Sequence, residues 1–223
     1  MSNPENPSRI EGSRDRERAS LGMEIPVEAM PNSVKVIILQ HPQEPDKELG
    51  SASLLVRALG SAELKVGLSW RNLKTVAGET ALPGEWAVLY LGSKGDSVLP
   101  EQVNFVSQKN NPIPQPPGIK GLIVLDGTWS QAKALWWRNA WLLKLKRIVL
   151  QPKERSRYGN MRKEPRAEAL STIESCALAI EKLDPKGGAV RAHLENAFTR
   201  MLEEFKNRKR SKGGGSIVPP ARP

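Results

Sequence analysis

The chain has one cysteine and two histidines among its 223 residues, and this scarcity excludes several kinds of site. A lone thiol, Cys176, can form neither an intramolecular disulfide nor a multi-cysteine zinc site. With His41 and His193 as the remaining nitrogen ligands, we predict no bound metal. The sequence also lacks an apolar run of about 20 residues and a signal-peptide stretch near its start. We therefore expect a soluble cytoplasmic protein with no membrane partner.

Positive charge is what the chain has in excess. Its 34 Lys and Arg outnumber its 24 Asp and Glu, which gives a net charge of +10. Such a balance favours a polyanionic partner, and nucleic acid is the leading candidate. No feature of the sequence implies a protein partner.

The length fits one globular domain with extended ends. Residues 1–31 mix both charge signs with Pro, Ser and Gly, and are expected to form a mobile, disordered leader. Residues 32–205 form the predicted domain. Residues 206–223 are Lys- and Arg-rich before a Gly- and Pro-rich end, a composition that predicts a basic disordered tail.

Strand and helix patterns alternate through this domain. Short apolar runs closed by turn formers predict strands at residues 34–39, 86–91, 122–125 and 147–150. Helical periodicity is found at about 53–59, 128–141, 171–182 and 190–205. The proline-rich stretch 110–118 is expected to be an extended connector. The alternation predicts an α/β fold with a mostly parallel sheet and flanking helices.

The segment 126–132, Asp-Gly-Thr-Trp-Ser-Gln-Ala, lies where a predicted strand ends and a Trp-rich helix begins. In open α/β sheets this carboxyl edge is where ligands bind. Thr128 and Gln131 have the spacing of a capping box, which needs no function beyond closing the helix end. Alternatively, the carboxylate of Asp126 could hold a ligand or accept a proton beside the free helix amides. The pattern alone leaves both interpretations open.

A second capping-box pattern, Ser171-Thr172-Ile173-Glu174, opens another apolar helix. Capping and ligand binding are compatible here, because cap residues sit at the open end of a helix. Cys176, on the apolar face of the same helix, is predicted to be an inert buried thiol.

Residues 144–166 carry nine Lys and Arg against two Glu, which is +7 of the net +10. Such a run is either a solvated face or an RNA-docking surface in which Tyr158 stacks on a base. The tryptophans nearby are expected in the core, with Trp137 and Trp141 packed together one helical turn apart.

Several separated segments of the sequence resemble motifs of the DTW-domain family, the tRNA-uridine aminocarboxypropyltransferases. Residues 121–132, Gly-Leu-Ile-Val-Leu-Asp-Gly-Thr-Trp-Ser-Gln-Ala, look like its signature, and residues 41–44, His-Pro-Gln-Glu, resemble its His-Pro-x-Glu loop. Downstream, residues 157–165 resemble its basic loop and residues 170–177 its Ser-Thr-Ile/Leu-Glu-Ala block, in the expected order. The similarity spans roughly residues 34–182.

The resemblance implies a SPOUT-like fold whose C-terminal half can be knotted to form the cofactor cleft. It implies S-adenosylmethionine as co-substrate, tRNA as partner, and transfer of the 3-amino-3-carboxypropyl group to N3 of a tRNA uridine. The catalytic residues expected are Asp126, Thr128 and Trp129. The cofactor-binding residues expected are Leu89, Tyr90, Leu125, Ser171, Thr172 and Glu174. RNA contacts are expected from Arg155, Arg157, Tyr158, Arg162 and Lys163, with His41 and Glu44 as further cleft candidates.

Two departures from the family pattern keep alternatives open. Residues 1–33 contain no cysteine, although many relatives carry a Cys cluster there, and the usual Leu-Tyr-Pro-Ser is replaced at residues 89–93 by Leu-Tyr-Leu-Gly-Ser. The alternatives are a SPOUT-type RNA methyltransferase and a catalytically silent RNA-binding module. Within the proposed reaction, Asp126 is either the general base or a ligand of the cofactor.

Overall fold

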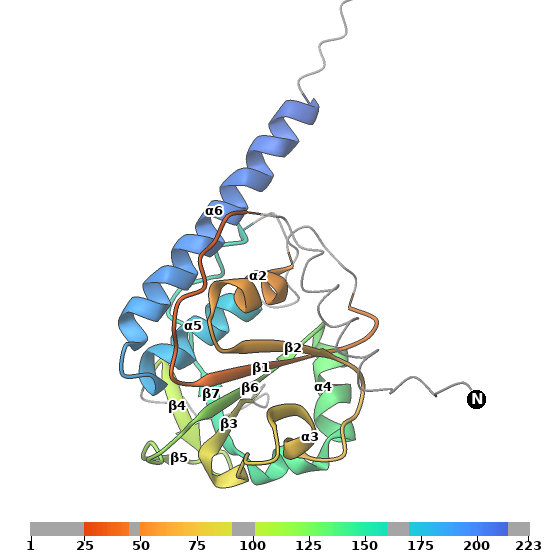
Figure 1. Cartoon of the computed structure of the whole chain (residues 1–223), viewed down its shortest axis with the longest axis vertical. Coiled ribbons are helices and arrows are strands. Elements are labelled where there is room, and N and C mark those ends of the chain that lie inside the picture. The colour runs from red at the N-terminus through yellow and green to blue at the C-terminus, as the bar shows by residue number, and fades with distance from the viewer. Residues whose placement is uncertain (1–24, 45–49, 91–100, 160–169, 214–223) are drawn as a thin grey trace, which may run out of the picture.

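A computed structural model of the chain describes residues 25–44, 50–90, 101–159 and 170–213. These residues form one sheet with helices on both faces (Figure 1). Its seven strands are β1 (Lys35–Gln40), β2 (Ala62–Val66), β3 (Trp86–Leu89), β4 (Val103–Val106), β5 (Pro112–Ile113), β6 (Gly121–Asp126) and β7 (Lys146–Leu150).

The strand order in the sheet is β2-β1-β6-β3-β7-β4-β5. The first five strands in that order are parallel, while β4 runs antiparallel to both β7 and β5. The predicted α/β class with a mostly parallel sheet is confirmed. In the centre, β1 and β6 pair so that Gln40 lies opposite Asp126 at the carboxyl edge.

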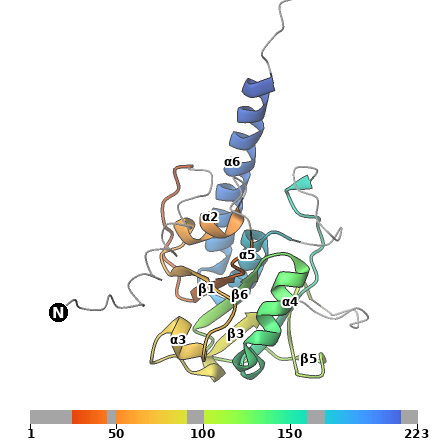
Figure 2. The same ribbon diagram turned by 90° about the vertical axis from the view of Figure 1, so that its right-hand side faces the viewer.

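Among the described residues, five α-helices cover the sheet: α2 (Ser51–Ala58), α3 (Leu73–Ala77), α4 (Trp129–Arg138), α5 (Thr172–Leu183) and α6 (Gly187–Gly213). Two 3₁₀ turns, Pro83–Glu85 and Ala140–Lys144, precede β3 and β7. Helices α2, α5 and α6 lie on one face, and α3 and α4 lie on the other (Figures 1 and 2).

The apolar runs of the strands supply both faces of the sheet, because successive side chains point to opposite sides. In β1, Val36 and Ile38 pack in the core under α2, α5 and α6, whereas Ile37 and Leu39 pack in the core under α3 and α4. All four side chains are fully buried. Burial on both faces explains why the central strands read as unbroken apolar runs.

The elements that the sequence did not reveal lie outside the centre of the sheet. Edge strand β2 has the sequence Ala-Glu-Leu-Lys-Val, and its exposed face carries the ion pairs of Glu63 with Lys35 and Lys65. Ala62, Leu64 and Val66 pack against the core and alternate with Glu63 and Lys65, which is the pattern of a half-buried strand that the prediction missed. The expected proline connector contains β5 at the opposite edge, where a proline without an N–H is tolerated.

The domain boundaries at both ends differ from the prediction. Ile25 is buried in the core, and the backbone N–H of Met30 donates to the carbonyl of Ala58 at 2.9 Å. Residues 25–31 therefore belong to the fold and not to a disordered leader. At the other end, α6 continues to Gly213 instead of stopping near Phe205. None of the described helices is long and apolar enough to cross a membrane.

Candidate active site

The carboxylate of Asp126 lies at the carboxyl edge of the sheet, where two other elements hold it. Gln40 Nε2, at the end of β1, donates to Asp126 Oδ2 at 2.9 Å. Thr172 Oγ1, in the first turn of α5, donates to Asp126 Oδ1 at 2.5 Å. The carbonyl of Asp126 also accepts from the backbone N–H of His41 at 3.1 Å. Asp126 is half-buried, so a ligand can still reach it.

Gln40 is a site residue that the sequence reasoning missed. Its Oε1 is buried and has no hydrogen-bond partner among the residues that the structure describes. A buried acceptor of this kind is costly unless a ligand donor or water satisfies it. The signal that could have found it was its place as the last residue of a buried strand, directly before the His41 motif.

The His41 loop is an ordered turn beside the same edge. His41 is buried, its Nδ1 accepts from the backbone N–H of Gln43 at 3.1 Å, and its carbonyl accepts from that of Glu44 at 2.9 Å. Glu44 is buried as well. Both cleft candidates therefore lie at the carboxyl edge, where His41 shapes the turn next to Asp126.

Gly127 makes the sharp turn from β6 into α4 possible. Its φ of 147° lies in the region that favours glycine, and a Cβ there would meet Gln131 Cβ at 2.9 Å and His41 Cβ at 3.5 Å. The turn brings the start of α4 against the His41 loop.

Thr128 and Gln131 form the capping box that their spacing predicts. Thr128 Oγ1 accepts from the backbone N–H of Gln131 at 3.3 Å, and Gln131 Oε1 accepts from that of Thr128 at 2.6 Å. Thr128 is exposed and Trp129 is half-buried, one residue inside the helix. The capping interpretation of this segment is thus confirmed, and the Asp126 carboxylate lies two residues before the capped helix end.

The second capping box is also present, and it gives Glu174 an internal function. Glu174 closes the start of α5 with Ser171, and its carboxylate also accepts from Ser156 Oγ at 2.6 Å and from the backbone N–H of Arg157 at 2.8 Å. Both Ser171 and Glu174 are buried. Of the predicted cofactor-binding residues in α5, Thr172 is therefore the one directed at Asp126.

The other predicted cofactor contacts divide between the two cores. Leu89 is buried under α5 and α6, while Leu125 packs in the core under α4. Tyr90 packs against Trp136 in a tilted arrangement with ring centroids 4.9 Å apart, and the Arg147 guanidinium lies 5.2 Å from the Tyr90 ring. Tyr90 and Leu125 thus line the α4 side of the edge that carries Asp126.

Comparison with known proteins identifies the family of this chain. The family model of the DTW domain matches residues 20–206, which is most of the chain. The chain belongs to the DTW-domain family. We call Asp126, Thr128 and Trp129, which the sequence resemblance places in the family signature, the DTW motif, and they lie at the carboxyl edge of the parallel sheet.

The chain is similar to several curated proteins that are named tRNA-uridine aminocarboxypropyltransferases. It is 28% identical to tRNA-uridine aminocarboxypropyltransferase 2 of Macaca fascicularis, over 80% of this chain and 56% of that protein. It is 26% identical to tRNA-uridine aminocarboxypropyltransferase A of Arabidopsis thaliana, over 80% of this chain and 73% of that protein. The chain thus spans little more than half the length of the monkey relative. No solved structure matches the chain.

The basic loop that follows β7 is less open to RNA than its sequence suggested. Tyr158 is fully buried and packs edge-to-face on Phe198 of α6, with ring centroids 5.0 Å apart. The predicted stacking of Tyr158 on a base is therefore wrong, because neither ring face reaches solvent. Arg155 and Arg157 are both exposed, and Arg157 pairs with Glu195 at 2.7 Å. Arg162 and Lys163 lie outside the described residues.

The tryptophans of α4 also differ from the prediction. Trp141 is buried, and its Nε1 donates to the carbonyl of Trp70 at 3.0 Å. Trp137 is 76% exposed. The expected Trp137–Trp141 pair does not form, because α4 ends at Arg138 and the chain continues as a 3₁₀ turn from Ala140.

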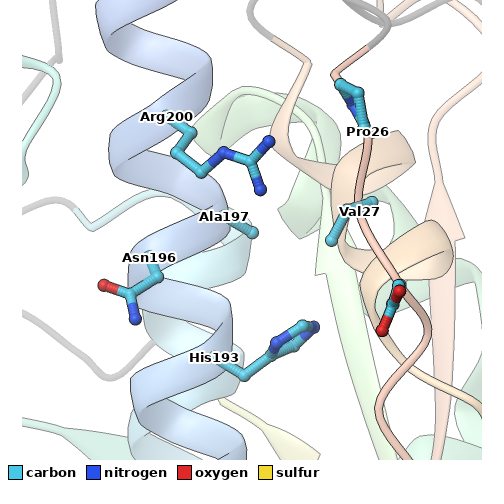
Figure 3. A pocket seen from close by; sticks show the side chains of 7 residues that line it. Pro26, Val27, His193, Asn196, Ala197 and Arg200 are labelled. Carbon is cyan, nitrogen blue, oxygen red and sulfur yellow. The ribbon is translucent and has the colours of Figure 1, made fainter.

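A pocket of about 490 Å³ lies elsewhere, between α6 and residues 26–28. Figure 3 shows His193 and Arg200 of α6 directed toward Pro26 and Val27. None of its lining residues belongs to the DTW motif or to the carboxyl edge. In the described part of the chain, no three His, Cys, Asp or Glu side chains cluster as a metal site.

Proposed function

We propose that this protein is a tRNA-uridine aminocarboxypropyltransferase that moves the 3-amino-3-carboxypropyl group of S-adenosylmethionine to N3 of a tRNA uridine. The observation that carries the proposal is the carboxylate of Asp126 in a DTW motif, held between Gln40 and Thr172 at the ligand-binding edge of the sheet. The names of the curated relatives support the same reaction.

In this reaction a bond forms between uridine N3 and the methylene carbon next to the sulfonium sulfur. The bond between that carbon and sulfur breaks, and the electron pair stays on sulfur as methylthioadenosine leaves. N3 loses its proton during the attack. Asp126 is our candidate to accept it, since each of its oxygens already accepts one hydrogen bond and keeps a further lone pair.

The two donors of Asp126 have a positioning function in this proposal. Gln40 and Thr172 come from different elements, so they restrict both the torsion and the direction of the carboxylate. Precise orientation matters because the propyl carbon, and not the methyl carbon, must face the nucleophile. Gln40 Oε1 is an open acceptor beside Asp126 and would suit an N–H or O–H of the bound co-substrate.

Several finer assignments belong to the same proposal. Thr128, Trp129, Tyr90, Leu125 and Thr172 would line the co-substrate cleft. The proposal also includes a SPOUT-like arrangement with a knot in the C-terminal half. It further includes action on tRNA in the cytoplasm. The parallel α/β sheet supports the fold class of this proposal, and the family membership supports its reaction.

The test is product analysis with S-adenosylmethionine labelled separately in its methyl and aminocarboxypropyl groups. Unmodified tRNA incubated with the protein should gain the aminocarboxypropyl label on uridine, with methylthioadenosine as by-product. Methyl label on RNA together with S-adenosylhomocysteine would instead identify a methyltransferase. Binding of tRNA without transfer of either label would identify a silent RNA-binding module.

A further inference from the structure

Trp137 is unusual among the tryptophans of this protein because it is 76% exposed, whereas Trp86, Trp136 and Trp141 are buried. Tryptophan is highly buried on average, since its ring has a large apolar area. One exposed apolar residue alone needs no explanation. Its surroundings are what point to a ligand.

The sequence on either side of Trp137 carries charge of a single sign. Residues 127–153 contain six Lys and Arg and no Asp or Glu. Ser130, Lys133 and Trp137 are exposed at positions i, i+3 and i+7 of α4, so they share one face of the helix. Arg138 and Lys144 are exposed just beyond them. We call these five residues the α4 strip.

The cations of the α4 strip have no ion-pair partner in the part of the chain that the structure describes. Within the described residues, no carboxylate pairs with Lys133, Arg138 or Lys144, whereas Lys120, Arg157, Lys182, Arg191 and Arg208 each form an ion pair. A cluster of unpaired cations beside an exposed indole complements the phosphates and bases of a single nucleic-acid strand.

The strip also begins at the candidate active site. Helix α4 starts directly after Asp126 and Gly127, and Trp137 lies eight residues beyond Trp129. At a rise of 1.5 Å per residue this is about 12 Å along the helix. Figure 2 shows α4 in the foreground, on an outer side of the fold. A strand with one nucleotide at Asp126 could therefore continue along α4.

We propose that the α4 strip binds the tRNA strand adjacent to the target uridine, with an unpaired base stacked on Trp137 and phosphates at Lys133 and Arg138. This inference rests on the proposed function for the identity of the RNA. It moves the principal RNA contact from Tyr158, which is buried, to a helix that leads away from the site. Stacking suits this task because every base has a π-face, so it tolerates different flanking sequences.

Equilibrium binding of an unmodified tRNA transcript to the full chain, over a series of salt concentrations, tests the proposal. Trp137→Ala should weaken binding about 5- to 100-fold without changing the salt dependence, because it removes stacking and no charge. Trp137→Tyr should keep most of the affinity. Lys133→Gln with Arg138→Gln should flatten the salt dependence by up to about two units. Ile113→Ala, an exposed apolar residue on the distant edge strand β5, is the matched control.

The proposal is overturned if Trp137→Ala binds tRNA as the unchanged protein does, or if the unchanged protein binds no tRNA. It is also overturned if Trp137→Ala changes only the sedimentation of the free protein, because Trp137 would then contact a second copy. Transfer by the unchanged protein without any effect of Trp137→Ala would refute the strip and leave the enzyme function standing. If Trp137→Ala weakened tRNA binding but the unchanged protein transferred no group, the α4 strip would stand and the proposed enzyme function would be refuted.

Discussion

The hydroxyl of Thr172 donates a hydrogen bond to the carboxylate of Asp126, 46 residues earlier in the chain. This contact joins the first turn of α5 to the end of β6, and Gln40 joins the end of β1 to the same carboxylate. The candidate base is thus positioned by three elements at once. Its activity should depend on that geometry as well as on its charge.

Asp126→Asn should slow group transfer by roughly 10²–10⁴ while leaving the fold nearly unchanged. The amide keeps the shape of the carboxylate but cannot accept the proton of uridine N3. The measurement is the rate of methylthioadenosine release at saturating co-substrate, together with thermal unfolding. Near-normal turnover by the folded variant would leave Asp126 as a turn residue.

Thr172→Val should slow transfer about tenfold, less than Asp126→Asn, because it removes one of the two donors that orient the carboxylate. A positioning function predicts a fall in kcat with little change in the KM for tRNA. Thr199→Val is the matched control, because Thr199 lies on α6 and bonds Arg157. Equal effects of the two variants on kcat would contradict the positioning function.

Glu174→Gln should lower the free energy of unfolding by about 1–3 kcal/mol, because it puts an amide among donors that need an acceptor. The carboxylate accepts from Ser156 and Ser171 and from the backbone N–H of Arg157, so the basic loop should loosen as well. Denaturant unfolding measures the first effect. Glu181→Gln breaks a more exposed ion pair with Arg191 and should cost less than about 1 kcal/mol.

Cys176 should resist alkylation in the folded protein. The thiol is fully buried, and burial raises its pKa well above the ordinary value, so the reactive thiolate is scarce at neutral pH. The predicted burial of this thiol is confirmed. Labelling should therefore require unfolding. Mass spectrometry across a denaturant series should show that alkylation of Cys176 and unfolding of the protein have the same midpoint. Rapid labelling under native conditions would place the thiol at the surface.

Neutralising Arg155, Arg157 and Arg162 together should weaken tRNA binding and reduce its salt dependence by about one unit, or slightly less, for each phosphate that is no longer bound. The contribution of Arg157 should be the smaller, because it already pairs with Glu195. Glu195→Gln is a control that keeps all three cations. The comparison is with deletion of residues 206–223. If that deletion abolished binding while the triple variant bound normally, the basic loop would not contribute to tRNA binding.

The sequence was sufficient to predict the parts of this protein whose local pattern and tertiary environment agree. The buried strands around Ile37, Val88 and Ile123 read as apolar runs, and both capping boxes are present at Thr128 and Ser171. The burial of Tyr158 and the exposure of Trp137 could not be read in the same way. Each depends on what packs against it from distant elements, Phe198 in one case and nothing described in the other. Gln40 was missed for the same reason, because its partner lies 86 residues away.

The strand order has a consequence for how the chain reaches this structure. Strands β3 and β4 are neighbours in sequence, yet β7 lies between them in the sheet. If β3 and β4 paired early, β4 would take the place beside β3 that belongs to β7, a strand synthesised about 40 residues later. This pairing would then have to break. Productive folding must therefore keep the β4–β5 hairpin detached until β7 has been synthesised. Sheet assembly should be slow and dominated by contacts distant in sequence. Mutations that stabilise a premature β3–β4 hairpin should retard folding without lowering native stability.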